Sequence, residues 1–120
     1  MIKELSDHEE AIKAGLCFSD NYRVYEWSEN GYRVYFSATR QGNAMPIHIA
    51  AERDSRRCLR LASNEFCEYL FEEYDWCDVV IGAIVSASVV NLAKKCGFTY
   101  LTDVEIHTGE IAAVYSRSRQ

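Results

Sequence analysis

The stretch VVIGAIVSASVVNLAKKCGF, residues 79–98, decides the fold. Its first part, Val79 to Val85, is a continuous apolar run of the kind that forms a central strand covered on both faces. Ser86 or Ser88 can then cap a short helix, and Gly97 follows two lysines, a pattern typical of the residue just beyond a helix C-terminus. The stretch therefore predicts a buried strand followed by a helix.

The segment before this unit has the periodicity of a helix. Between Asp54 and Tyr74 apolar residues recur every three or four positions, which places them on one helical face. We expect this face to contain Cys58, Ala62, Phe66, Tyr69 and Leu70. A long helix therefore precedes the central strand.

The rest of the chain has the residue types of strands and turns. Asn30-Gly31 separates two aromatic and β-branched runs, which indicates a hairpin because both residues tolerate positive φ. The expected strands are Ile2–Leu5, Tyr22–Trp27, Tyr32–Phe36, Met45–Ala51, Tyr100–Ile106 and Ile111–Tyr115, and the expected additional helices are Asp7–Cys17 and a segment ending at Cys96. The predicted order is β-α-β-β-β-α-β-α-β-β, a single-domain α/β fold with one mixed sheet over residues 1–120.

The composition argues against several classes of protein. The 120 residues carry 13 basic and 18 acidic side chains, a formal net charge of −5, which disfavours nucleic acid as a partner. The longest apolar run falls far short of the ~20 residues that cross a bilayer, and the charged start is not a signal peptide, so we expect a cytoplasmic protein without membrane contact. Five cysteines without a C-x-x-C pair and three scattered histidines predict buried free thiols and no metal site.

The element order and the passage from Val79 to Phe98, with its K-K-C-G-F end, resemble the GCN5-related N-acetyltransferase superfamily over nearly the whole chain. The arginine-led helix and the E-E-Y-D segment also resemble the small, degenerate acetyltransferase-fold proteins of short-tailed bacteriophages. The first resemblance implies transfer of an acetyl group from acetyl-coenzyme A to an amine. The second implies a catalytically inactive component of the virion or of a host complex, found in the virion or the infected cell.

The superfamily resemblance implies a cofactor site at Arg53-Asp-Ser-Arg-Arg-Cys58. In the family, backbone N–H groups of an R/Q-x-x-G-x-G/A turn hold the pyrophosphate at the start of the long helix. Here Arg53 is retained, but Arg56 and Cys58 replace the two glycines, so the guanidinium groups of Arg56 and Arg57, with Ser55, are expected at the phosphates instead. A solvated basic turn is the alternative.

The same resemblance implies a reaction cleft between the strands Met45–Glu52 and Val79–Val85. Glu52 matches a region from which several family members take a general base, and His107 is a second candidate because its ordinary pKa suits neutral pH. Either residue can equally be an exposed surface group. The tyrosine that commonly protonates the leaving thiolate falls at Ala93 and is therefore absent, whereas Ser86 replaces a frequent asparagine and keeps a hydrogen-bonding group there.

One acidic stretch is explained neither by helix capping nor by the cofactor site. Negative charge near the C-terminus of the long helix opposes the helix dipole, and the stretch can be a solvated face or a surface for a basic protein partner. Its members are Glu65, Glu68, Glu72, Glu73, Asp75 and Asp78. A homodimer is a further expectation, and binding of nucleic acid through the arginines Arg53, Arg56, Arg57 and Arg60 is the least favoured of the functions considered.

Overall fold

The computed structural model describes residues 1–120 and contains one seven-stranded sheet with the strand order β1-β2-β3-β4-β5-β7-β6. The elements are β1 (Ile2–Leu5), α1 (Glu9–Lys13), β2 (Arg23–Glu29), β3 (Tyr32–Ala38), β4 (Ala44–Ala51), the 3₁₀ helix η1 (Arg53–Cys58), α2 (Leu59–Glu73), β5 (Val79–Ile84), α3 (Ala87–Lys95), β6 (Thr99–Glu105) and β7 (Ile111–Ser118). The predicted α/β class and element order are confirmed.

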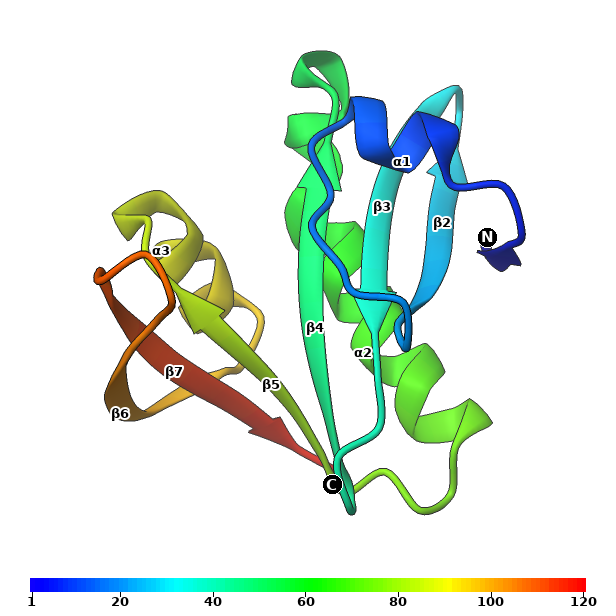
Figure 1. Cartoon of the computed structure of the whole chain (residues 1–120). Helices are drawn as coiled ribbons and strands as arrows, with labels where there is room; N and C mark the ends of the chain where they lie inside the picture. Colours follow the sequence, from blue (N-terminus) through cyan, green and yellow to red (C-terminus); the bar gives the residue numbers. More distant parts are fainter.

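The sheet consists of two halves that meet at one parallel contact (Figure 1). Strands β1 to β4 form an antiparallel meander, and β5, β7 and β6 form a second antiparallel group. The halves are joined by the parallel pairing of β4 with β5. Figure 1 shows these two strands diverging upward from that contact.

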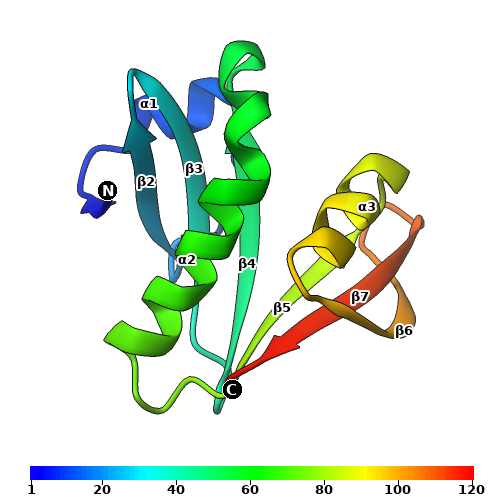
Figure 2. The same ribbon diagram turned by 180° about the vertical axis from the view of Figure 1, so that it is seen from behind.

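Helices lie on both faces of the first half but on only one face of the second. The main core joins α2 to β2, β3 and β4, and its largest members include Trp27, Phe36 and Phe66, with Phe36 and Phe66 stacked at 4.1 Å between ring centroids. A smaller cluster around Ala11 and Tyr35 packs α1 against the opposite face. Figure 2 shows α2 and α3 together on one side, flanking the gap between β4 and β5.

Two turns adopt the backbone that the sequence predicts. Asn30 and Gly31 have φ of 53° and 83° and close the β2–β3 hairpin. Gly97 has φ of 80°, and the N–H of Phe98 donates to the carbonyl of Ala93 at 3.0 Å, which ends α3 in the expected way.

Several expectations are corrected. The first helix spans only Glu9–Lys13 because the chain turns at Gly15 with φ of 96°, and the Asp7 carboxylate accepts the N–H of Glu9 at its start. Strand β5 is not covered on both faces, since Val80 alone among its residues is buried. Cys17 is exposed and Cys58 half-buried, so only three of the five thiols are buried. None of the helices has the length and apolar character needed to span a membrane.

Candidate functional site

The site begins where β4 and β5 separate. Their ladder has three pairs and ends at Pro46–Ile81. Beyond it, β4 remains paired with β3 as far as Ala51, and β5 remains paired with β7 as far as Ile84. Each strand is therefore held by its other neighbour, and the gap between them follows from the strand pairing.

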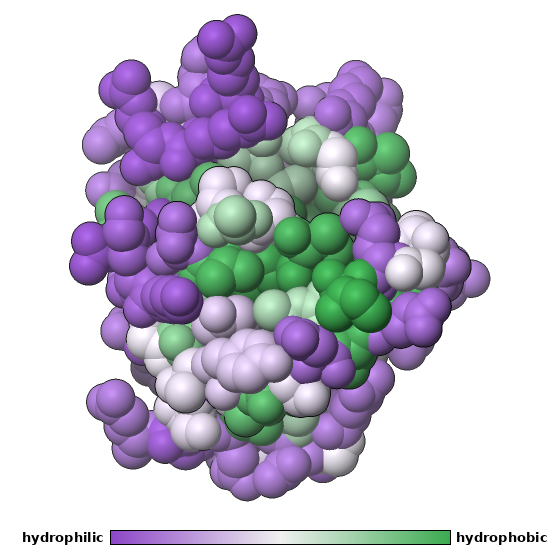
Figure 3. Space-filling view, turned by 90° about the vertical axis from the view of Figure 1, so that its left-hand side faces the viewer, coloured by the Kyte–Doolittle hydropathy of each residue, from purple (hydrophilic) through white to green (hydrophobic).

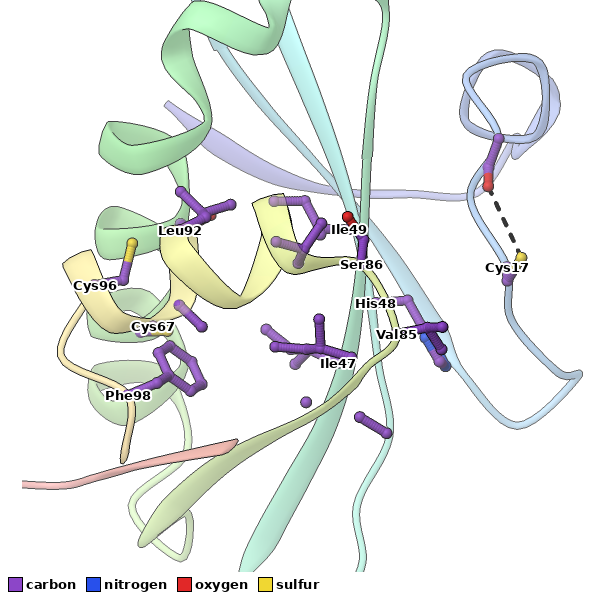
Figure 4. Close-up of a pocket in the computed structure, with 17 residues that line it drawn as sticks. Cys17, Ile47, His48, Ile49, Cys67, Val85, Ser86, Leu92, Cys96 and Phe98 are labelled. Carbon is purple, nitrogen blue, oxygen red and sulfur yellow. Dashed lines mark hydrogen bonds between the residues drawn. The ribbon is translucent and has the colours of Figure 1, made fainter. Parts of the chain in front are cut away.

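A cavity of about 550 Å³ lies between the separated parts of β4 and β5 and extends toward α2 and α3 (Figure 4). Most of its lining is apolar, and none of it is Asp, Glu, Lys or Arg. The lining residues are Gly15, Cys17, Ile47, His48, Ile49, Ser63, Cys67, Gly82, Ala83, Ile84, Val85, Ser86, Val89, Leu92, Ala93, Cys96 and Phe98. Figure 4 shows Cys17, His48 and Val85 toward one end and Cys67, Cys96, Leu92 and Phe98 toward the other.

The cavity offers hydrogen-bonding groups that the protein itself does not use. The N–H of Thr39 donates to the carbonyl of Pro46, so the alternation of an antiparallel ladder turns the backbone groups of Ile47 and Ile49 toward the gap, where β5 no longer pairs. The hydroxyl of Ser63 on α2 is buried and has no hydrogen-bond partner. A buried polar atom without a partner is costly, and a ligand in the cavity would satisfy it.

Exposed arginines surround the start of the α2 region. Arg53 and Arg56 in η1 and Arg60 in α2 form neither side-chain hydrogen bonds nor ion pairs. Arg57 donates to the hydroxyl of Tyr32 at 3.2 Å and lies over its ring. These cations form a local environment that favours an anion, although the chain as a whole is acidic.

The other two predicted cofactor-binding side chains point inward. Ser55 is buried, and its hydroxyl oxygen accepts the N–H of Arg33 at 2.9 Å, which ties η1 to β3. Cys58 packs against the main core. Both positions therefore contribute directly to the fold, and the exposed part of the turn consists mainly of arginines.

The predicted catalytic residues are distributed unevenly around the cavity. Ser86 lines it at the start of α3, where its hydroxyl is 2.8 Å from that of Ser88. Ala93, at the position of the missing tyrosine, lines it as well. Glu52 is exposed just before η1, and His107 is exposed in the β6–β7 turn, and neither belongs to the lining.

His48 lines the cavity and was not identified from the sequence. It lies between Ile47 and Ile49 on β4, both of which pack toward the main core, so the strand turns His48 to the α1 face. Its ring contacts Tyr22 at 5.4 Å between centroids and forms no hydrogen bond. His48 is exposed at the mouth of the cavity, but the atoms packed around its ring partly desolvate it, which lowers its pKa below the ordinary value of 6.5, so the imidazole is mostly neutral at pH 7 and can accept a proton. The sequence did contain a signal for it, because the alternation Ile47-His48-Ile49 in a predicted strand places His48 on the face opposite the two isoleucines.

The buried thiols of the cavity are poor nucleophiles. Burial raises the pKa of Cys67 to about 12 and also raises the pKa of Cys96, so both remain protonated at neutral pH. The structure brings no group of three His, Cys, Asp or Glu side chains into a metal-binding arrangement. The ionisable group suited to proton transfer here is therefore His48.

Comparison with solved structures assigns the fold. A GCN5-related N-acetyltransferase from Kribbella flavida aligns with 99% of this chain and 97% of its own, with a TM-score of 0.68 at 13% identity. Ribosomal-protein-alanine N-acetyltransferase from Brucella melitensis aligns with 93% of this chain and 76% of its own, with a TM-score of 0.66 at 16% identity. An aminoglycoside acetyltransferase in complex with coenzyme A and kanamycin aligns with 83% of this chain and 68% of its own, with a TM-score of 0.68 at 16% identity.

These similarities show that the chain has the acetyltransferase fold. It spans 64% of the length of two further similar structures, one from Bacillus halodurans and one from Acinetobacter baylyi. No protein-family model matches the sequence. No curated protein matches it either.

Proposed function

We propose that the protein is an acyl-coenzyme A-dependent N-acyltransferase that uses the gap between β4 and β5. The observation that carries this proposal is the termination of the β4–β5 ladder at Pro46–Ile81, above which the cavity opens. The fold is that of acetyltransferases, one of which was solved with coenzyme A. The cofactor is therefore proposed to be acetyl-coenzyme A and the acceptor an amine.

The chain's own groups fit such a cofactor. The backbone groups of Ile47 and Ile49 and the hydroxyl of Ser63 can pair with the amides of a pantetheine arm in the apolar cavity. Arg53, Arg56 and Arg57 would hold the phosphates, with Arg57 moving from Tyr32. Ser55 and Cys58 position this turn, so side-chain cations take the place of the backbone cradle that glycines allow.

In the proposed reaction His48 accepts the proton of the acceptor amine on the α1 side of the gap. When bound, the cofactor supplies an acyl group as a thioester whose C–S bond breaks as the amine nitrogen bonds to the carbonyl carbon. Ser86, at the start of α3, can donate a hydrogen bond near the departing sulfur, because Ala93 provides no acid. Glu52 would act through water, since it lies outside the cavity lining.

The binding half of the proposal is tested with acetyl-coenzyme A by calorimetry and thermal unfolding. Ligand at a hundred times its dissociation constant should stabilise the fold by ~2.7 kcal/mol. Arg53→Glu with Arg56→Glu should abolish most of this stabilisation. Lys3→Glu with Lys13→Glu makes the same change in net charge on β1 and α1 and should leave it intact. Absence of both heat and thermal shift at millimolar ligand would refute the proposal.

A second candidate function is that of an inactive interaction component, as in a phage virion or a host complex. It is favoured by β6, in which every residue is exposed. Five of the eight exposed large apolar side chains lie between residues 85 and 111, and Figure 3 shows apolar side chains gathered on the side formed by α3, β5, β6 and β7. Sedimentation of the purified chain with and without virion or host proteins tests this candidate, and a lone monomer in every case would remove it.

A further inference from the structure

We infer that the acceptor is a primary amine carried on an uncharged, apolar body, and that polycationic amines are poor acceptors. This inference rests on the proposed function, because it assigns the α1 side of the gap between β4 and β5 to the acceptor. It concerns the wall that the acceptor meets on its way to His48.

The wall of the cavity contains no carboxylate. Its lining comprises 17 residues, none of them Asp or Glu, and the residues drawn near His48 in Figure 4 are Val85 and Cys17. An amine that reached His48 would therefore lie against apolar groups. His48, Cys17 and Val85 are exposed, so an additional ammonium group on the same molecule would keep part of its water here but would gain no counter-ion from the wall.

The sheet surface next to the cavity is uncharged as well. Val80 packs with α2 in the main core, so the pairing of β5 with β7 places Ile81 and Ala83 on the opposite face together with Ser116 and Val114. On β6, Thr102 and Val104 share this face because they lie opposite Val114 and Ala112. The charged residues of these strands, Asp103, Glu105 and Arg117, fall on the α3 face.

The same wall assists the chemistry of a monoamine. An ammonium group that enters apolar surroundings is easier to deprotonate, because desolvation disfavours its charged form. His48 is neutral at pH 7 and can take that proton. One uncharged surface therefore both selects the acceptor and activates it.

The experiment compares phenethylamine with spermine in the presence of excess coenzyme A. Calorimetry measures the affinity of each amine for this complex at two salt concentrations, and mass spectrometry measures acetylated product with acetyl-coenzyme A. We expect phenethylamine to bind at least about tenfold more tightly, with little dependence on salt. Tighter binding of spermine, weakened by salt, would overturn the inference while leaving the proposed transferase intact.

Two matched variants distinguish the effect of a carboxylate in the cavity wall from the effect of an added negative charge elsewhere on the protein. Val85 lines the cavity and is 50% exposed, whereas Ile111 is 60% exposed and lies outside the lining. Val85→Asp should raise the affinity ratio of spermine to phenethylamine about tenfold, and Ile111→Asp should leave it unchanged. Equal effects of both variants would contradict the inference. A protein that binds coenzyme A but binds neither amine would also contradict the inference. Failure to bind coenzyme A would instead count against the proposed function.

Discussion

At the scale of the residue, the alternation of β4 decides which side chain can act as the base. Ile47 and Ile49 face the main core, and His48 is turned to the α1 side by the pleat. A shift of one position in the strand would bury His48 under α2. The candidate base therefore depends on register as much as on residue type.

His48→Gln should reduce the rate of acetyl transfer by about 10²- to 10⁴-fold while acetyl-coenzyme A still binds. In the wild type, kcat/KM should rise with pH through the pKa of His48, which partial desolvation holds below 6.5, and level off toward neutrality because only the neutral ring accepts a proton. The variant should lose this limb. A pH-rate profile with an unchanged limb in His48→Gln would exclude His48 as the base.

At the scale of the element, the acidic stretch on and after α2 consists of two kinds of residue. Glu65 accepts a hydrogen bond from the buried indole N–H of Trp27, Glu68 lies 3.9 Å from Arg117, and Asp78 accepts from Asn43 at 3.0 Å. Glu72, Glu73 and Asp75 are exposed without such partners. Half of the stretch therefore has partners within the fold, whereas Glu72, Glu73 and Asp75 remain the part that can face solvent or a basic partner.

Glu65→Ala should lower the free energy of unfolding by about 1–3 kcal/mol, because the N–H of the fully buried Trp27 would lose its partner. Glu72→Ala should change it by no more than about 0.5 kcal/mol, because that side chain is exposed near the end of the same helix. Urea unfolding of both variants makes the comparison. Equal destabilisation would show that Glu65 does not support Trp27.

The end of α3 allows a second matched comparison of stability. Gly97→Ala should destabilise the fold by about 1–2 kcal/mol, because φ of 80° is unfavourable for any residue with a Cβ, even though a Cβ there meets no atom within 4 Å. Gly82→Ala on β5 has no such backbone and places its Cβ 3.9 Å from Ile84. Thermal unfolding should show a loss for Gly97→Ala alone, and a loss of the same size for both would contradict the assignment to backbone strain.

The elements were predictable because each depends on local pattern, whereas the cavity depends on distant contacts. The hairpin at Asn30-Gly31 and the stop at Gly97 are properties of a few neighbouring residues. By contrast, Ser63 became a candidate only when α2 placed it over the gap, and it looks like any other helix residue in the sequence. Likewise, Ser55 in η1 turns inward because its hydroxyl oxygen accepts the N–H of Arg33 on β3, a residue distant in the sequence.

At the scale of the whole molecule, the central feature is a sheet whose two halves separate where the short ladder between β4 and β5 ends. The meander of β1 to β4 packs around α2, and the smaller arm of β5, β7 and β6 meets it at three residue pairs (Figure 1). The network of Arg117, which donates to Asn64 and to the carbonyl of Cys96, links the arm to α2 and the end of α3. These contacts attach the arm to the helices on one side of the sheet.

The most direct measurement of the central claim is a crystal structure of the protein with coenzyme A. The account predicts the pantetheine arm between β4 and β5, hydrogen-bonded to the backbone of Ile47 or Ile49 and to Ser63, with its phosphates at Arg53 and Arg56 and its sulfur toward His48. Coenzyme A bound elsewhere, or density in this gap that leaves Ser63 and the β4 edge without partners, would contradict the account.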